Sequence, residues 1–267
     1  MSKCFAGIFV YEREFMLDVI NLRKIYKGSQ NGIFDAKFSC EKGTITGIAG
    51  PNGSGKTTFI NALVGFIKKD SGTATLNGHD LDSLKIQKRI ANVSDDILLI
   101  NDLTGREYLS FIERVYQVSN RTKKDQLLEL FNLEEDIDHL ISSYSHGMKK
   151  KIQLIASFIQ DFDLLILDEP CRGLDIESIF ILKKILQQFQ KKDKIILISS
   201  HDLLFVEEIC NEMIIISKGK ILDKGIPKVL KDKYRTTSIE EVFLKSTLMA
   251  EREGKIEALL FDFSNND

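Results

Sequence analysis

The sequence is poor in the residues that mark disulfide-rich and zinc-binding proteins. Its 267 residues include no tryptophan, three prolines and four cysteines. The cysteines, Cys4, Cys40, Cys171 and Cys210, are scattered and form no C-x-x-C pair, which argues against a zinc site and a disulfide framework. We therefore expect no disulfides and a chain that works in a reducing cytoplasm.

Long apolar runs are also missing. No stretch approaches the roughly 20 apolar residues that a membrane-spanning helix requires. The apolar segment 4–11 is short and lacks the small-residue cleavage site of a signal peptide. We expect a cytoplasmic protein in which any role at a membrane depends on a partner, and we expect residues 1–15 to form an N-terminal appendage.

A charge excess of either sign is absent as well. The chain carries 37 lysines and arginines against 39 acidic residues, a formal net charge of −2. This balance gives no electrostatic basis for binding nucleic acid. We interpret the lysine runs at 149–151 and 191–192 as solvated surface rather than as a binding patch.

The chain does contain a complete phosphate-binding loop of the pattern G-x-x-x-x-G-K-[ST]. The loop and the residue after it read Gly50, Pro51, Asn52, Gly53, Ser54, Gly55, Lys56, Thr57 and Thr58. The glycines let the backbone turn with its N–H groups aimed at an anion. Lys56 can reach the β- and γ-phosphates, and the Thr57 hydroxyl can ligate Mg²⁺. A strand predicted over 43–49 and a helix over 57–64 favour a phosphate site over an inert glycine turn.

Strand and helix patterns alternate along most of the chain. Strands are predicted over 19–25, 34–40, 44–49, 71–78, 164–167, 195–198 and 213–216, and a helix over 176–191. Helical spacing dominates between 97 and 160, over 107–118, 123–131 and 148–159. This pattern predicts an α/β fold with a mainly parallel sheet, an antiparallel β edge, and a helical subdomain inserted at about 97–160.

Two acidic residues end the apolar strand at 164–167. In an open α/β sheet ligands bind at the carboxyl ends of the strands, where Asp168 and Glu169 lie. An aspartate at this place can hold Mg²⁺, as a Walker-B aspartate does, and Glu169 is placed to accept a proton from an attacking water.

Three shorter motifs have a structural alternative beside a functional one. Ser145-His146-Gly147 precedes an amphipathic helix whose free N–H groups suit an anion, although an ordinary capped helix reads the same way. Gly173-Leu174-Asp175 follows the acidic strand. His201 follows the strand at 195–198, where imidazole could bind a terminal phosphate or simply lie on the surface.

In this order the motifs resemble the nucleotide-binding subunit of an ABC transporter over about residues 16–225, with 226–267 as a C-terminal extension. The resemblance implies that the α/β fold is a P-loop NTPase core with a RecA-like sheet. The resemblance implies a head-to-tail dimer, with itself or a paired ABC subunit, that holds two ATP and Mg²⁺. It implies catalytic roles for Lys56, Glu169 and His201, and Mg²⁺ ligands at Thr57, Asp95 and Asp168.

The resemblance also implies residues that bind ATP from both chains. Each ATP would lie between the phosphate loop of one chain and the helix start Ser145, His146 and Gly147 of the other, with Asp175 in the loop that links the two sites. Tyr26 matches the aromatic residue that stacks on adenine, while a tyrosine that merely ends a strand is the alternative.

Two departures from the family pattern affect this expectation. His146 replaces a glycine of the helix-start motif, and the flanking Tyr144 and Met148 resemble the subgroup that serves ABC-2-type exporters. Asp95 stands where the family has a glutamine, or Asp96 if the alignment shifts by one residue. An aspartate cannot donate an amide hydrogen bond to the attacking water, so we expect somewhat slower hydrolysis.

The resemblance implies an ATP hydrolase that drives transport, in our interpretation export, through a separate transmembrane permease. The chain would then lie on the cytoplasmic face of the membrane. The aromatic stretch Tyr108, Phe111 and Tyr116 would dock on the permease or form insert core, and segment 238–244 resembles the tail of export-type subunits. The alternatives are a soluble ABC-type ATPase of cofactor assembly and a slow regulatory cassette.

Overall fold

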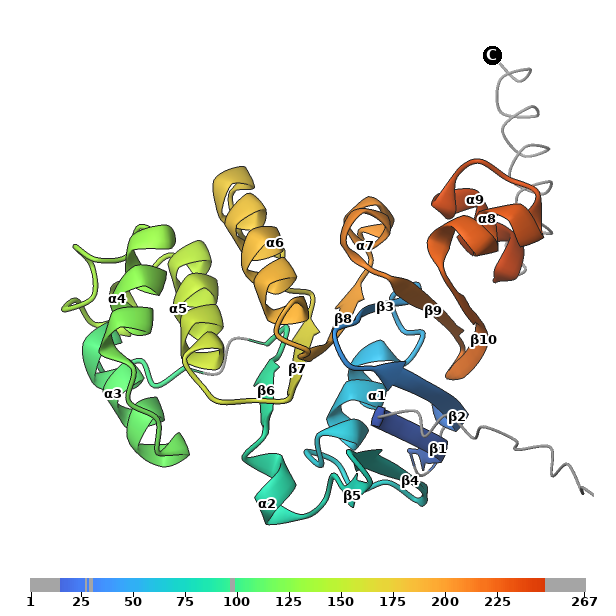
Figure 1. Ribbon diagram of the computed structural model, residues 1–267, viewed down its shortest axis with the longest axis horizontal. Coiled ribbons are helices and arrows are strands. Elements are labelled where there is room, and N and C mark those ends of the chain that lie inside the picture. The colour runs from blue at the N-terminus through green and yellow to red at the C-terminus, as the bar shows by residue number, and fades with distance from the viewer. Residues whose placement is uncertain (1–14, 27, 29–30, 97–98, 248–267) are drawn as a thin grey trace, which may run out of the picture.

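A six-stranded sheet forms the centre of the computed structural model, which describes residues 15–26, 28, 31–96 and 99–247 (Figure 1). Its order is β10-β9-β3-β8-β7-β6. The strands are β3 (Ile45–Ala49), β6 (Ile90–Val93), β7 (Leu164–Asp168), β8 (Ile195–Ser200), β9 (Glu212–Ser217) and β10 (Lys220–Gly225). All pairs are parallel except β9 with β10. The predicted mainly parallel sheet is confirmed, although its two edge strands, β6 and β10, were not predicted.

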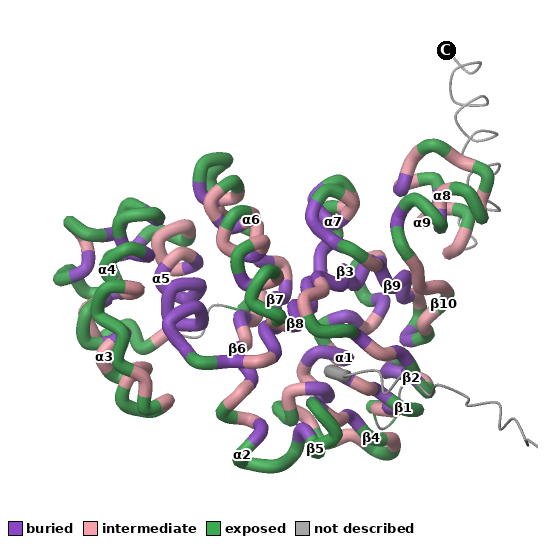
Figure 2. The backbone as a smooth tube through the Cα atoms, in the orientation of Figure 1, coloured by how far each residue is buried: buried purple, intermediate pink, exposed green. Residues whose placement is uncertain are grey.

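Burial of the central strands follows from this topology. Every residue of β3, β7 and β8 is buried (Figure 2), as expected for parallel strands covered on both faces. Leu165 and Ile196 face one core and Leu164 and Ile195 the other, because side chains alternate along a strand. Each fully buried leucine or isoleucine contributes about 1.5–3 kcal/mol to stability.

The antiparallel β region forms a sheet of its own rather than a continuation of the parallel one. It comprises β1 (Phe15–Ile25), β2 (Gly32–Glu41), β4 (Ser71–Leu76) and β5 (His79–Asp80), in the order β2-β1-β4-β5. Helix α1 (Lys56–Leu63) shares a core with this sheet and with one face of the parallel sheet. The short helix α2 (Leu84–Gln87) leads from β5 to β6.

The helices predicted between 97 and 160 are present and lie beside the parallel sheet (Figure 1). They are α3 (Gly105–Tyr116), α4 (Arg121–Leu130), the 3-10 turn η1 (Ile141–Ser143) and α5 (His146–Phe158). Helices α6 (Ile176–Gln190) and α7 (Leu203–Ile209) pack into the same core as α5. In this core the rings of Phe158 and Phe189 meet edge to face, with 5.4 Å between their centroids. The helix predicted at 123 begins two residues earlier because Asn120 caps it.

The C-terminal extension continues with α8 (Pro227–Tyr234) and α9 (Ile239–Ser246). Ser238 caps α9 by accepting hydrogen bonds from the backbone of Glu240 and Glu241, and Ile239 and Val242 are buried. Residues 248–267 of this extension and residues 1–14 of the expected N-terminal appendage lie outside the described residues. The domain boundaries therefore stay predictions.

The interpretation of the lysine run 149–151 as solvated surface is wrong for two of its residues. Lys150 is 1% exposed, and Lys151 forms an ion pair with Asp175 at 3.1 Å. The reason is that α5 packs against the sheet, so one side of the helix start faces inward. Lys191 and Lys192 are exposed, as expected.

Other expectations about the surface can be placed on the structure. Tyr108 is buried in the insert core, Phe111 is exposed and Tyr116 is half-buried, so the aromatic stretch is not a single surface. Cys40, Cys171 and Cys210 are free thiols, and Cys4 lies outside the described residues. Within residues 15–247, as far as the structure describes them, no helix has both the length and the apolar character to span a bilayer.

Candidate functional site

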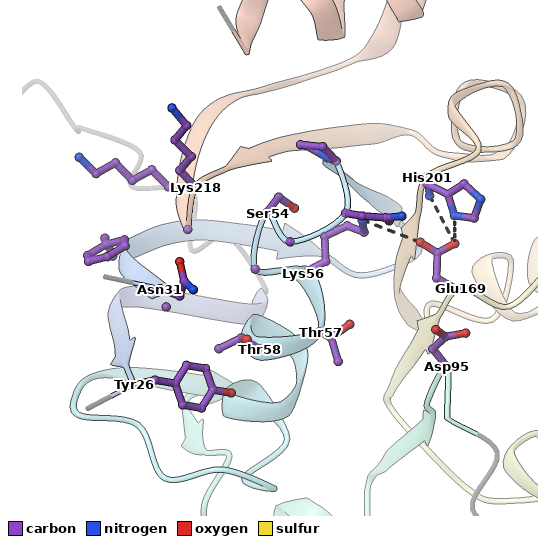
Figure 3. Close-up of a pocket in the computed structure, with 18 of the residues that line it drawn as sticks. Tyr26, Asn31, Ser54, Lys56, Thr57, Thr58, Asp95, Glu169, His201 and Lys218 are labelled. Carbon is purple, nitrogen blue, oxygen red and sulfur yellow. Dashed lines mark hydrogen bonds and ion pairs between the residues drawn. The ribbon is translucent and has the colours of Figure 1, made fainter. Parts of the chain in front are cut away.

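A cavity of about 1230 Å³ lies over the phosphate loop, between the antiparallel sheet and the ends of the parallel strands (Figure 3). It brings together most of the predicted site residues: Tyr26, Pro51, Asn52, Gly53, Ser54, Gly55, Lys56, Thr57, Thr58, Asp95, Glu169 and His201. Six predicted residues do not line it: Gly50, Asp168, Ser145, His146, Gly147 and Asp175.

The phosphate loop has the backbone geometry of an anion site. Gly53 and Gly55 adopt φ of 78° and 106°, a left-handed conformation that other residues reach only with strain. Gly50 is packed so closely that an added Cβ would collide with the Ser54 hydroxyl and the Ile216 carbonyl. Ser54 Oγ is buried without a hydrogen-bond partner among the described residues, and no side chain caps α1. The N–H groups at the start of α1 are therefore available to phosphate oxygens.

Lys56 lies within this loop and is almost fully buried. Its Nζ donates a hydrogen bond to the Gly50 carbonyl at 2.7 Å and lies 3.9 Å from Glu169 Oε1. Burial lowers the pKa of Lys56, while the neighbouring carboxylates of Glu169 and Asp168 act in the opposite direction. The ammonium thus has acidic neighbours as well as phosphate-loop contacts.

Asp168 does not line the cavity and is 1% exposed. Thr57 Oγ1 donates to its Oδ2 at 3.0 Å, and the Ser199 hydroxyl donates to its Oδ1. A buried carboxylate beside a phosphate-loop hydroxyl is the oxygen donor set that Mg²⁺ prefers in nucleotide sites. The residues present therefore fit the expected metal.

Glu169 and His201 meet at the ends of β7 and β8 (Figure 3). His201 Nδ1 lies 2.8 Å from Glu169 Oε2, and the His201 backbone N–H donates to the same oxygen at 3.3 Å. Glu169 has φ of 47°, a conformation that is uncommon outside glycine. With this backbone turn the Glu169 side chain lines the cavity, whereas the Asp168 side chain does not.

Asp95 lies at the cavity wall two residues after β6, and Asp96 does not line the cavity. Arg172 forms an ion pair with Asp95, with 2.7 Å between Nη1 and Oδ2. Asp95 Oδ1 is buried and has no hydrogen-bond partner among the described residues. Sequence reasoning missed Arg172, whose signal was a cation placed shortly after the two acids.

The start of α5 lies away from the cavity and is exposed. Ser145 Oγ accepts a hydrogen bond from the Met148 backbone at 3.2 Å, and Ser145 and His146 lie on the surface. The His146 ring occupies the space where a side chain at Gly173 would lie. The helix start therefore packs against the loop Gly173–Asp175 of its own chain.

Asp175 ends this loop as the N-cap of α6. It accepts a hydrogen bond from the Ser178 backbone at 2.7 Å, and that bond and the nearby Lys151 hold the pKa of Asp175 down at about 2. Asp175 thus has a structural role that is visible within one chain.

Further cavity residues come from segments to which the sequence assigned no role. They are Ile25, Asn31, Gly32, Phe34, Arg172, Lys218, Gly219 and Lys220. Gly219 is packed against the Gly32 carbonyl, which joins the turn between β9 and β10 to β2. Two lysines around one glycine in a strand connection were the signal for this part of the cavity.

The comparisons with known proteins agree on one family. A model of the ABC transporter family matches residues 33–172. The SkfA peptide export ATP-binding protein SkfE of Bacillus subtilis (strain 168) is 34% identical over 80% of this chain and 90% of that protein. The bacitracin transport ATP-binding protein BcrA of Bacillus licheniformis is 31% identical over 78% of this chain and 69% of that protein. A solved structure of an ATP-binding subunit of an ABC transporter has a TM-score of 0.80 and 26% identity, covering 87% of this chain and 99% of that one.

Proposed function

This chain belongs to the ABC transporter family, in which it is an ATP-binding subunit and ATP hydrolase, and from that premise we propose that it works as a head-to-tail dimer enclosing two ATP. The observation that carries the proposal is the incompleteness of the cavity. Ser145, His146 and Gly147 do not line the cavity of their own chain, yet they start a 13-residue helix at the surface. A second chain can bring this helix start to the open side of the cavity.

The electrostatics of the helix start support this arrangement. The first turn of α5 carries no acidic side chain, so its dipole and its N–H groups favour a negative ligand. In the dimer Ser145 and the Gly147 N–H would contact the γ-phosphate of the ATP held by the partner's phosphate loop. Asp175 would lie between the two sites, where it already orders the loop beside His146.

Within one chain, the residues divide the chemistry as follows. Lys56 and the phosphate-loop N–H groups bind the β- and γ-phosphates, and Tyr26 stacks on the adenine. Thr57, Asp168 and Asp95 would hold Mg²⁺, which when bound would neutralise charge on the phosphates. Glu169 orients a water molecule and accepts its proton, and His201, in contact with that carboxylate, keeps it aimed at the γ-phosphate.

We further propose that the chain powers export through a separate permease on the cytoplasmic face of a membrane. The names of SkfE and BcrA refer to peptide export and bacitracin transport. Segment 238–244, whose sequence resembles the tail of export-type subunits, lies at helix α9 and its N-cap. Phe111, exposed on α3, is a candidate contact for the permease.

Mixing two inactive variants tests the head-to-tail dimer. Lys56→Ala disables a phosphate loop and Ser145→Arg blocks a helix start, so each homodimer lacks an intact site. In a mixed dimer one site has both intact halves, and about a quarter of wild-type turnover should return if dimers form at random. The control mixes Lys56→Ala with Glu169→Gln, which leaves no intact site. No rescue in the first mixture would contradict the dimer.

Asp95 favours one alternative, a slow regulatory cassette, because it lacks the amide of the family's glutamine. Wild-type hydrolysis with Mg²⁺ separates the two functions. If the purified chain does not hydrolyse ATP, the assay is repeated in lipid with a membrane protein encoded beside this chain. Turnover would then indicate a transporter, and its continued absence would indicate a regulatory cassette. A chain that hydrolyses ATP but binds no such membrane protein would instead be a soluble ABC-type ATPase.

A further inference from the structure

Lys150 is a buried cation that the proposed chemistry does not use. It lies on α5 between Lys149 and Lys151, yet its side chain is enclosed and 1% exposed. Lysine is rarely buried unless its ammonium is paired. Its partners therefore indicate why the position carries a lysine.

The ammonium of Lys150 contacts the ends of two neighbouring strands. Its Nζ donates a hydrogen bond to the Ser94 carbonyl at 3.1 Å and lies 3.5 Å from the Asp168 carbonyl oxygen. Ser94 follows β6 and Asp168 ends β7, which pair in parallel from Ile90 with Leu164 to Val93 with Leu167. The next residues along the chain are Asp95 and Glu169. One ammonium thus spans the two backbone segments that present the acidic groups of the site.

The acidic side chains at these strand ends also interact electrostatically with Lys150. Burial lowers its pKa, and the carboxylates of Asp95, Asp168 and Glu169 oppose that effect by stabilising the ammonium. Arg172 reaches Asp95 from the cavity side, whereas Lys150 approaches from the helical insert. Asp95, which introduces a negative charge at this place, is therefore paired with Arg172, and Lys150 holds the carbonyl of the residue before it.

We propose that Lys150 is a positioning residue for ATP hydrolysis, which fixes α5 to the strand ends that carry Asp95, Asp168 and Glu169 and balances their charge. The inference rests on the proposed function of these acids. Since α5 also begins with Ser145–Gly147, Lys150 links the ATP site of its own chain to the surface offered to the partner chain.

The test compares Lys150→Met with Lys149→Met in the full-length protein. Methionine keeps much of the length of lysine without its charge. Lys149 lies on the same helix, where its backbone N–H donates to the Ser145 carbonyl and its side chain has no hydrogen bond or ion pair among the described residues. We expect Lys150→Met to lower kcat about tenfold or more with less than a threefold change in the KM for ATP, while Lys149→Met behaves as wild type. Equal kcat in the two variants would overturn the proposal.

A double variant separates positioning from stability. Asp95→Asn removes the charge that Lys150 balances. The double variant, Lys150→Met with Asp95→Asn, should therefore have a kcat at least about threefold higher than that of Lys150→Met alone. Lys150→Gln, which keeps a donor without a charge, should fall between Lys150→Met and wild type. Losses that simply multiply in the double variant, or that follow the melting temperature in all variants, would reduce Lys150 to a structural residue.

A binding measurement keeps this proposal distinct from the proposed function, because it needs no turnover. In a Glu169→Gln background, ATP affinity is measured with Mg²⁺ and with a chelator. Lys150→Met should leave the ATP affinity in chelator unchanged. It should lower the ratio of the affinity with Mg²⁺ to the affinity in chelator about threefold or more, because Asp168 is displaced once Lys150 no longer holds its carbonyl. If this ratio of affinities is the same in Lys150→Met and in Lys149→Met, the proposal is overturned, even if the wild-type chain alone hydrolyses no ATP.

Discussion

The Nδ1 atom of His201 lies 2.8 Å from Oε2 of Glu169, which joins the ends of β8 and β7 through two side chains. The other carboxylate oxygen of Glu169 lies 3.9 Å from the Lys56 ammonium. The Glu169 carboxylate therefore lies between two side-chain nitrogens, which restrict its orientation, and a water molecule can replace either contact. This relationship makes Glu169 the residue whose substitution is most informative.

Glu169→Gln should lower turnover at least about 100-fold, because general base catalysis typically contributes 10²–10⁴-fold. Nucleotide binding should persist, since the phosphate loop is unchanged, and the variant should accumulate as an ATP-bound dimer in size-exclusion chromatography. Steady-state phosphate release checks the rate. Glu134→Gln, an exposed position in the helical insert, is the control. Near-normal turnover in Glu169→Gln would assign the base elsewhere.

Asp95→Gln should raise the hydrolysis rate about threefold or more, because an amide can donate to the attacking water and removes a negative charge near the γ-phosphate. Asp96→Gln is the matched control, since Asp96 does not line the cavity. The variant also leaves Arg172 without its carboxylate partner, so Arg172→Gln is measured alongside. An unchanged rate in Asp95→Gln would refute the idea that this aspartate slows turnover.

Local sequence patterns predicted most of the fold, because each of these patterns is compatible with only one kind of backbone conformation. Apolar runs placed β7, β8 and β9, and the loop Gly50–Thr57 placed β3 and α1. The patterns missed the two edge strands β6 and β10, of which β6 has only four residues. They also missed the separation of the antiparallel sheet, which depends on pairing between distant segments. They also missed the burial of Lys150, because a lysine run looks solvated until a neighbouring carbonyl and carboxylate are brought to it by the fold.

For the candidate site, the sequence identified residues whose chemistry is carried by their type and neighbours. Tyr26, Lys56 and Glu169 line one cavity although they lie on separate elements. The sequence could not show that Arg172 pairs with Asp95, because this contact depends on where the loop after β7 turns. Nor could it show the cavity residues between β9 and β10, which belong to an ordinary strand connection until the fold brings them to β2.

Asp175 gives a prediction about stability. Asp175→Ala should lower the free energy of unfolding by about 1 kcal/mol, because α6 loses its N-cap, and Asp175→Asn should retain most of that contribution. Urea unfolding at pH 7 measures both. The pKa of Asp175 is about 2 in the folded state, below the ordinary 3.8. Ionised Asp175 therefore stabilises the fold above pH 3.8, and this contribution is lost as the pH falls toward 2. Equal stability of Asp175→Ala and wild type would show that the cap contributes nothing.

Cys171 gives a prediction about reactivity. Burial raises the pKa of its thiol from 9.0 to about 12, so the thiolate fraction at pH 8 falls about a thousandfold. Higher basicity makes each thiolate more nucleophilic, which offsets part of this loss, and the net alkylation rate should fall about 30- to 100-fold. The measurement uses iodoacetamide on a variant in which Cys4, Cys40 and Cys210 are replaced by serine.

The control for Cys171 is the same variant in denaturant, where the thiol regains its ordinary pKa and should react at the rate of a model peptide. In the folded protein the rate should rise about tenfold per pH unit through pH 10, because the thiolate fraction is still far from its maximum. A rate that levels off near pH 9 would mean that the Cys171 thiol is not desolvated. The loop after Glu169 would then be more open to water than its contacts with the strand ends indicate.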